Sequence, residues 1–193
     1  MRGNEPNIHI RRAAADDAWS IESVLHASFV EYESSYTVEA FAATTPTYEQ
    51  IQHRMSEGPL WVALQGEAIV GTVSAVPKSE AVNIRGMAIL RTARGQRIGT
   101  LLLEQVEEYA SGHGYKRLYL STTPFLTRAI RLYERCGFQR SDEGPHDLFG
   151  TPLFTMVKTL KADDELHSRK LVSVNVRRSR SSQRLRNLNL KAH

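Results

Sequence analysis

The sequence contains few features that a secreted or membrane-spanning protein would need. Its 193 residues include one cysteine, Cys136, so an intrachain disulfide is excluded. No stretch approaches the roughly 18 consecutive apolar residues of a membrane-spanning helix. The opening residues, MRGNEPNIHIRR, lack the apolar core of a secretory signal. We therefore expect a cytoplasmic protein with no membrane segment, in which 41% hydrophobic residues supply a globular core.

Three common kinds of ligand site are also missing from the sequence. No Gly-Lys-Ser or Gly-Lys-Thr occurs, which excludes the Walker phosphate loop. No Gly-x-Gly-x-x-Gly occurs, which excludes the usual dinucleotide fingerprint. The seven histidines show no metal-ligand spacing, so we expect no bound metal.

Positive charge is concentrated at the end of the chain. Residues 161–193 contain nine Lys and Arg against three Asp and Glu, whereas residues 1–160 contain 16 against 18. We assign residues 1–160 to one domain and residues 161–193 to a basic tail, mobile or partly helical. The tail segment RRSRSSQRLR has no interleaved aromatic residues, so nucleic-acid binding is a minor alternative to a solvated tail. The slightly acidic body would tolerate a cationic amine.

Periodicity and turn residues predict an α/β domain with a mixed sheet. Alternating apolar residues indicate strands, and apolar residues at helical spacing indicate helices. Residues 31–47 are polar and aromatic, and we expect them to form mostly loop, while Trp19 and Trp61 are expected in the core or lining a site. The predicted order is a strand at 8–13, a helix over 19–29 capped by Asp16 or Asp17, a helix at 45–58, a hairpin at 60–76, a strand at 81–90, a helix at 98–112, a strand at 116–123, a helix at 127–137 and a strand at 152–160.

The segment RTARGQRIGT, residues 91–100, joins a predicted strand to a predicted helix. A helix start offers unpaired N–H groups and the positive end of the helix dipole, which suit an anion such as phosphate. Gly95 permits unusual backbone angles, and Gly99 permits a close approach to a ligand. Arg94 and Arg97 add positive charge. The alternative interpretation is an ordinary turn with surface arginines.

Two segments together resemble the GNAT superfamily of N-acetyltransferases. The first, MAILRTARGQRIGTLLL, resembles the acyl-CoA pyrophosphate loop of that superfamily, Q/R-x-x-G-x-G/A, from Arg94 to Gly99. The second, AIRLYERCGF, follows about thirty residues later and resembles its A-x-x-x-Y-x-x-x-G-F segment, with Ala129 and Tyr133 at the marked positions. The resemblance covers residues 8–160.

The resemblance implies a fold and an acyl donor. The fold would be a mixed, mostly antiparallel sheet of six to seven strands, with helices on both faces and a parallel strand pair that splays apart at the cofactor site. Acetyl-CoA would lie between the strands at 81–90 and 116–123, with its pyrophosphate on the amides of residues 94–100. The residues implied for acetyl-CoA binding are Met87, Ala88, Ile89, Arg94, Gly95, Gln96, Arg97, Ile98, Gly99, Thr100, Ala129 and Tyr133.

Three positions depart from the pattern of the superfamily. Arg97 stands where the first loop glycine occurs, which narrows the backbone angles available. Leu126 stands where an asparagine often contacts the cofactor, and Arg91 stands where a proline is usual. None of these changes removes a backbone donor from the loop.

The resemblance also implies roles in catalysis. Tyr133 would protonate the departing thiolate, since a tyrosine and a thiol have similar basicity, and the Ile89 N–H would stabilise the oxyanion. The alternative for Tyr133 is a core tyrosine. The strand at 81–90 contains no carboxylate, so no general base is assigned. The candidates are Glu31, Glu33, Glu80, His146, Asp147 and a water relay.

The sequence therefore predicts an N-acetyltransferase that moves an acetyl group from acetyl-CoA to a primary amine of a small molecule or peptide. The amine would attack the thioester directly. The missing strand carboxylate favours one alternative, an acyl-CoA-binding sensor of the same fold without efficient turnover. A homodimer is a further expectation from the resemblance. Cys136 has no histidine near it in the sequence, so we expect a buried structural thiol.

Overall fold

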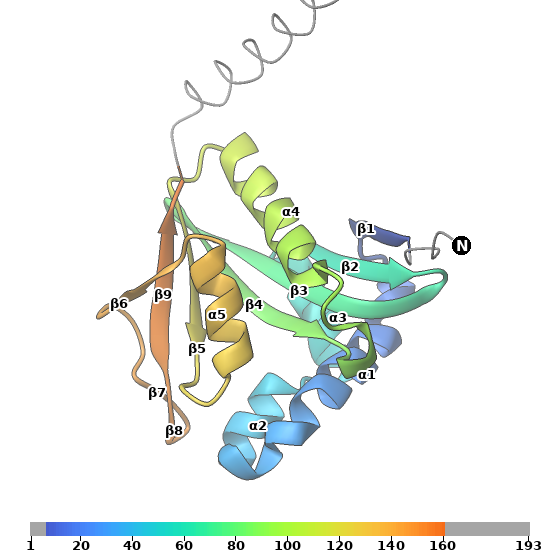
Figure 1. Cartoon of the computed structure of the whole chain (residues 1–193), viewed down its shortest axis with the longest axis horizontal. Helices are drawn as coiled ribbons and strands as arrows, with labels where there is room; N and C mark the ends of the chain where they lie inside the picture. Colours follow the sequence, from blue (N-terminus) through green and yellow to red (C-terminus); the bar gives the residue numbers. More distant parts are fainter. Residues whose placement is uncertain (1–6, 161–193) are drawn as a thin grey trace, which may run out of the picture. The chain divides into compact units, whose positions relative to one another are not determined.

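The computed structural model describes residues 7–160, so the predictions made for residues 161–193 lie outside it. Seven strands form one sheet in the order β1-β2-β3-β4-β5-β9-β6. Every neighbouring pair is antiparallel except β4 and β5, which are parallel (Figure 1). The predicted fold class is confirmed. The strands of this sheet are β1 (Ile8–Arg12), β2 (Leu60–Gln65), β3 (Ala68–Lys78), β4 (Ala81–Ile89), β5 (Arg117–Thr122), β6 (Gln139–Ser141) and β9 (Phe154–Thr159).

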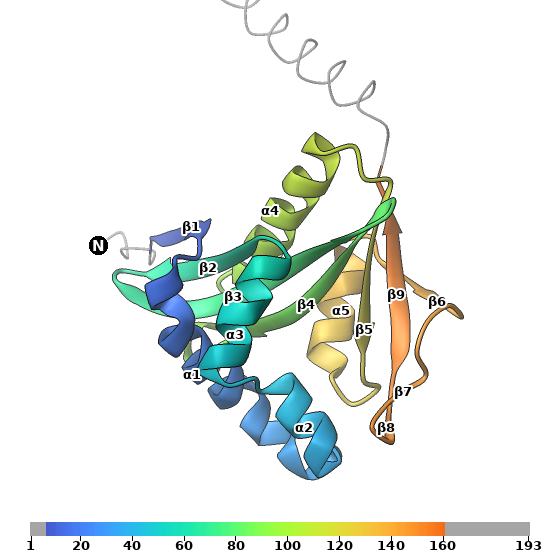
Figure 2. The ribbon, with the colours of Figure 1, turned by 180° about the vertical axis from the view of Figure 1, so that it is seen from behind.

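Helices cover both faces of the sheet. In Figure 1, α4 and α5 lie in front of the sheet, and Figure 2 shows α1 and α3 on the opposite face. A small hairpin of β7 (Asp147–Leu148) and β8 (Thr151–Pro152) stands apart from the main sheet. The helices are α1 (Ala18–Phe29), α2 (Val38–Thr44), α3 (Tyr48–Glu57), α4 (Ile98–Gly112) and α5 (Thr127–Arg135), with 3-10 turns at Ala15–Asp17, Val30–Ser35 and Arg91–Ala93.

Each face of the sheet has its own apolar core. The α4 side buries Val82 and Ile84 of β4 against α4 residues such as Leu102. The α1 side buries a stripe of α1 residues together with Ile51 of α3 and Ala88 of β4. Ile84 and Ala88 are four residues apart on one strand, yet they belong to opposite faces. A regular strand would place them on the same face, because its side chains alternate with period two.

The reason is a β-bulge at Gly86. β3 and β4 pair as Thr72 with Ala88 and as Ser74 with Arg85, so β4 has one extra residue between these pairs. Gly86 has φ +57°, the left-handed conformation that glycine adopts without steric cost. The bulge reverses the side-chain alternation of β4 and bends the strand. An isolated glycine inside the strand pattern NIRGMAI is the local sequence signal for it.

Two local predictions are wrong. Residues 31–47 contain a 3-10 turn and α2 instead of mostly loop, because Thr37 caps α2 by accepting a hydrogen bond from the Ala40 N–H at 3.2 Å. Trp19 is 63% exposed instead of buried, since it lies one position off the buried stripe of α1, and its ring stacks on Tyr48 with centroids 4.4 Å apart. Trp61 is buried as expected.

Candidate functional site

A cavity of about 1100 Å³ opens where β4 and β5 separate. The two strands pair only from Ala81 with Arg117 to Asn83 with Tyr119, so from Ile84 onward the β5-facing edge of β4 has no strand partner among the described residues. Both strands line the cavity, with residues 83–89 on one side and residues 120–123 on the other. The volume exceeds that of an ordinary small-molecule pocket, so the cavity can hold one long ligand or two substrates.

The backbone of β4 presents free hydrogen-bonding groups to this cavity. The Leu90 N–H donates to the Val70 carbonyl oxygen at 2.9 Å, which fixes the β3-facing edge at that residue. Successive residues of a strand point their N–H groups to opposite edges. The N–H and C=O groups of Ile89 therefore point into the gap, and so do those of Met87. This edge can pair with an extended ligand or donate to an oxyanion.

The start of α4 forms a second wall of the cavity. No side chain of residues 7–160 caps its first turn, so within that range the amides of Ile98, Gly99 and Thr100 are free to bind an anion. A Cβ on Gly99 would lie 2.5 Å from the Leu132 Cδ2 atom and 3.1 Å from the Ile89 Cδ1 atom. Only glycine permits this close approach of α4 to α5 and β4 without a shift of the neighbouring side chains.

The residue before α4 adopts an unfavourable backbone conformation. Arg97 has φ +60° and ψ 8°, in the left-handed region where a Cβ is costly. Gly95, two residues earlier, has φ +87° and open space around its Cα. Arg97, which stands where the family pattern has glycine, thus adopts the backbone angles of a glycine and raises the energy of the folded backbone.

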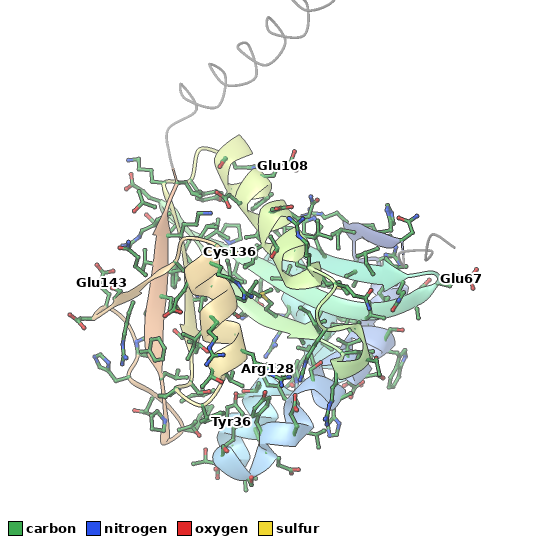
Figure 3. All side chains as sticks on the ribbon, viewed as in Figure 1. Tyr36, Glu67, Glu108, Arg128, Cys136 and Glu143 are labelled. Carbon is green, nitrogen blue, oxygen red and sulfur yellow. The ribbon has the colours of Figure 1, made fainter. Side chains whose placement is uncertain are left out.

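Arginines dominate the charge of the cavity. Arg94 donates to Glu31 through Nη2, while its Nη1 atom is buried without a hydrogen-bond partner among residues 7–160. Three more arginines follow one another along the exposed side of α5, and Figure 3 shows Arg128 near the beginning of that helix. Within the described chain the lining contains no Asp, Glu, Lys or His. The lining arginines are Arg54, Arg85, Arg94, Arg97, Arg128, Arg131 and Arg135.

The charge of the cavity differs from that of the domain as a whole. The acidic surplus of residues 1–160 lies elsewhere on the domain, and the cavity itself is positive. A positive cavity attracts phosphates and carboxylates and disfavours a second cationic group.

Tyr133 lies on α5 against the cavity and is 7% exposed. Burial, and then the neighbouring Tyr36 hydroxyl, raise the pKa of Tyr133 above its usual value. The phenol therefore stays protonated throughout the physiological range. Tyr36 also lines the cavity, and burial raises its pKa as well, partly offset by the hydroxyls of Thr123 and Thr44.

The candidate bases do not line the cavity. Glu31 is bound to Arg94, which holds the pKa of that carboxyl below its usual value. Glu80 pairs with Lys116 at 2.8 Å, at the end of the sheet where β4 and β5 are still joined. Asp147 accepts a hydrogen bond from the Gly150 N–H at 3.0 Å. Among the described residues, none of the candidate side chains Glu31, Glu33, Glu80, His146 and Asp147 reaches the lining.

The structure brings the predicted acetyl-CoA residues together with one exception. Gln96 does not line the cavity, and its Oε1 atom is buried without a partner among residues 7–160. Cys136 is half-buried, and burial raises the pKa of its thiol, which keeps it unreactive. The predicted residues that do line the cavity are Met87, Ala88, Ile89, Arg94, Gly95, Arg97, Ile98, Gly99, Thr100, Ala129 and Tyr133.

Several residues that line the cavity were not predicted from the sequence. Arg54 and Arg85 carry no local motif, and they meet only because α3 packs over β4. Arg128, Arg131 and Arg135 did carry a signal, since residues three, four and seven apart on a helix share one face.

Comparison with known proteins decides the family. A model of the acetyltransferase (GNAT) family matches residues 21–138. The chain belongs to this family. The matched region runs from α1 to the end of α5 and contains the β4–β5 gap and the α4 loop.

Relatives of known sequence are N-acetyltransferases by name. A probable N-acetyltransferase, camello, of Xenopus laevis is 38% identical over 84 residues, which are 42% of this chain and 38% of that protein. The uncharacterized N-acetyltransferase YjgM of Escherichia coli is 29% identical over 143 residues, which are 69% of this chain and 83% of that protein. The match to the camello relative spans about two fifths of that protein's length.

Solved structures share the fold at low sequence identity. An acetyltransferase of the GNAT family from Staphylococcus aureus has a TM-score of 0.68 at 18% identity, covering 80% of this chain and 100% of that one. The PaiA N-acetyltransferase of Thermoplasma acidophilum, solved in complex with coenzyme A, has a TM-score of 0.69 at 16% identity, covering 79% and 99%. No helix within residues 7–160 is long and apolar enough to cross a membrane.

Proposed function

We propose that this protein transfers an acetyl group from acetyl-CoA to a primary amine. The proposal is carried by one observation: three features that thioester aminolysis needs open onto a single cavity. They are the uncapped start of α4 with its arginines, the free edge of β4 at Met87–Ile89, and the buried hydroxyl of Tyr133. Membership of the acetyltransferase family supports it.

The residues present fit coenzyme A. The free amides of residues 98–100 and the unpartnered Nη1 of Arg94 are donors for a diphosphate. The N–H and C=O groups of Met87 and Ile89 can pair with the amides of an extended pantetheine arm. When bound, acetyl-CoA supplies the activated acetyl group as a thioester.

The chain then contributes position, charge stabilisation and one proton. The Ile89 N–H donates to the carbonyl oxygen, on which negative charge develops as the amine attacks. Burial raises the pKa of Tyr133, so the phenol keeps its proton at neutral pH but is a weaker acid than a free tyrosine. It donates that proton to the departing thiolate, and the proton released by the amine to water restores the phenol. No Asp, Glu or His of the described residues lines the cavity, so the amine reacts in its neutral form and its proton leaves through water.

The test is thiol release from acetyl-CoA by the full 193-residue chain over a panel of primary amines, with the N-acetyl product identified by mass. We expect product with at least one amine, and a rate that rises with the neutral fraction of that amine. Coenzyme A binding without N-acetyl product from any amine would contradict the proposal.

One alternative is an acyl-CoA sensor without efficient turnover. The absence of a carboxylate from the described lining favours it. The same assay separates the two functions, because a sensor binds acetyl-CoA and leaves the thioester intact in the presence of every amine.

A further inference from the structure

Two of the seven lining arginines lie on a different wall from the others. Arg54 projects from α3, on the sheet face opposite α4 and α5 (Figure 2). Arg85 lies on β4 directly before the bulge. The remaining five belong to the α4 loop and to α5, where the phosphates of coenzyme A are proposed to bind. The two walls thus approach the gap between β4 and β5 from opposite faces of the sheet.

Arg54 is a partly buried cation without a carboxylate partner among residues 7–160. Its Nη2 atom donates to the Ala43 carbonyl oxygen at 3.0 Å, and no ion pair compensates its charge. Burial, and then the neighbouring Arg85 charge, lower the pKa of Arg54 to about 10. A desolvated cation beside a second cation is unfavourable unless an anion joins them.

Arg85 is only partly satisfied within the described chain. It forms an ion pair with Glu57 of α3, but its Nε atom is buried without a hydrogen-bond partner among the described residues. Glu57 does not line the cavity, whereas Arg54 and Arg85 do. Among the described residues Glu57 therefore pairs with Arg85 alone, and the charge of Arg54, which also lines the cavity, has no carboxylate partner.

The pair is directed at the end of the free β4 edge. The Arg54 Nη1 atom lies 3.9 Å from the position that a Cβ on Gly86 would occupy. Gly86 is three residues from Ile89, a span of about 10 Å along an extended strand. A ligand that reaches from the guanidinium groups to the Ile89 N–H would therefore be a small molecule whose amine and anionic group are a few bonds apart.

We propose that the acceptor is a small amine that also carries a carboxylate or similar anionic group, and that Arg54 and Arg85 bind that group. The inference rests on the proposed acetyl transfer and names the substrate class of the same site. An anion between the two guanidinium groups satisfies donors that are otherwise unpaired, and it accepts the charge-assisted, bidentate hydrogen bonds that arginine forms best. A diamine or polyamine would bring a second positive charge into the cavity and is disfavoured.

The experiment compares matched acceptors. Amino acids with α-, β- and γ-amines are each paired with their primary amides, which keep the amine and remove the carboxylate. Steady-state rates are measured near pH 9 and expressed per neutral amine, because the amine of an amino acid has a higher pKa than the amine of its amide. The variants are Arg54→Gln, Arg85→Gln and the conservative Arg54→Lys. Arg117→Gln is the matched control, because Arg117 is half-exposed, lies outside the cavity lining and pairs with Glu143 at 3.1 Å.

For the wild type, we expect kcat/KM to be at least about 30-fold higher for the best amino acid than for its amide, the size of effect typical of a desolvated charge pair. Each Gln variant should lose about 30-fold with the amino acid, mostly in KM, and change little with the amide. Arg54→Lys should keep part of the preference, and Arg117→Gln should match the wild type. Coenzyme A affinity, measured by calorimetry on every variant, should stay unchanged.

Several results would overturn the inference while leaving acetyl transfer intact. One is a wild type that uses the amide or a diamine as efficiently as the amino acid. Another is a Gln variant that lowers kcat/KM equally for the amino acid and for its amide. Coenzyme A binding with no turnover of any anionic amine would also overturn it. If calorimetry shows no binding of coenzyme A to the wild type, that result contradicts the proposed acetyl transfer itself.

Discussion

The left-handed conformation of Arg97 leads to a testable prediction about the free energy of unfolding. Arg97→Gly should stabilise the protein although it removes a side chain. An L-residue in the left-handed region destabilises the folded state by about 1–2 kcal/mol, which a glycine avoids. The greater conformational freedom of glycine in the unfolded chain offsets about 0.5–1 kcal/mol of this gain. Arg97 makes no side-chain hydrogen bond as the N-cap of α4, so no capping energy is lost. The expected net gain is about 1 kcal/mol, or about 2–4 °C in Tm for a chain of this length.

Arg97→Ala is the control for this prediction. It removes the same charge from the arginine-lined cavity but keeps the Cβ that causes the strain. Thermal unfolding followed by circular dichroism should place Arg97→Gly above Arg97→Ala, while calorimetry should show coenzyme A binding weakened alike in both. Equal Tm values for the two variants would refute the assignment of strain to position 97.

Three further predictions test the acid, an ion pair and the packing. Tyr133→Phe should lower kcat by about 100-fold in the acetyl-transfer assay without changing the Kd for coenzyme A, and an unchanged kcat would remove Tyr133 from the mechanism. Asp17→Asn should cost about 1 kcal/mol at pH 7, because Arg11 donates to Asp17 at 2.6 Å and lowers the pKa of its carboxyl. The stability from this ion pair is present above the ordinary carboxyl pKa and is lost as the pH falls through the lowered pKa of Asp17. In urea unfolding, the difference in free energy of unfolding between wild type and variant should therefore shrink below about pH 4. A difference that stays constant with pH would contradict this. Gly58→Ala should destabilise by more than about 2 kcal/mol in the same assay, since its Cβ would lie 2.2 Å from the Ala75 carbonyl oxygen, and a stability equal to wild type would show that the backbone adjusts freely there.

Features with a local signature were predictable from the sequence. The helix of α4 ends within a residue of its prediction, because its apolar residues repeat at helical spacing from Ile98 onward. The loop before it combined glycines and arginines in a recognisable order. The short strands β6, β7 and β8 were not predicted, because segments of two or three residues are too short to carry a periodic signal.

The side of the cavity that contains Arg54 and Arg85 was not predictable for a different physical reason. Arg54 and Arg85 are 31 residues apart in the sequence and meet only through the packing of α3 on the sheet. The bulge at Gly86, directly after Arg85, reverses the alternation of β4 and is set by its pairing with β3. The separation of β4 and β5 after three residue pairs is likewise a long-range property. The overall charge of residues 1–160 does not indicate the charge of the cavity, because it is a sum over all of these residues.

The central claim is that the amides and arginines at the start of α4 bind the diphosphate of coenzyme A. Isothermal titration calorimetry of the full chain with coenzyme A, on the wild type and on Arg97→Glu, tests it most directly. We expect one site per chain for the wild type and an affinity at least about 10-fold weaker for the charge reversal, since about 1.4 kcal/mol of electrostatic binding energy is a tenfold change. No heat with the wild type, or the same affinity in both proteins, would contradict the claim.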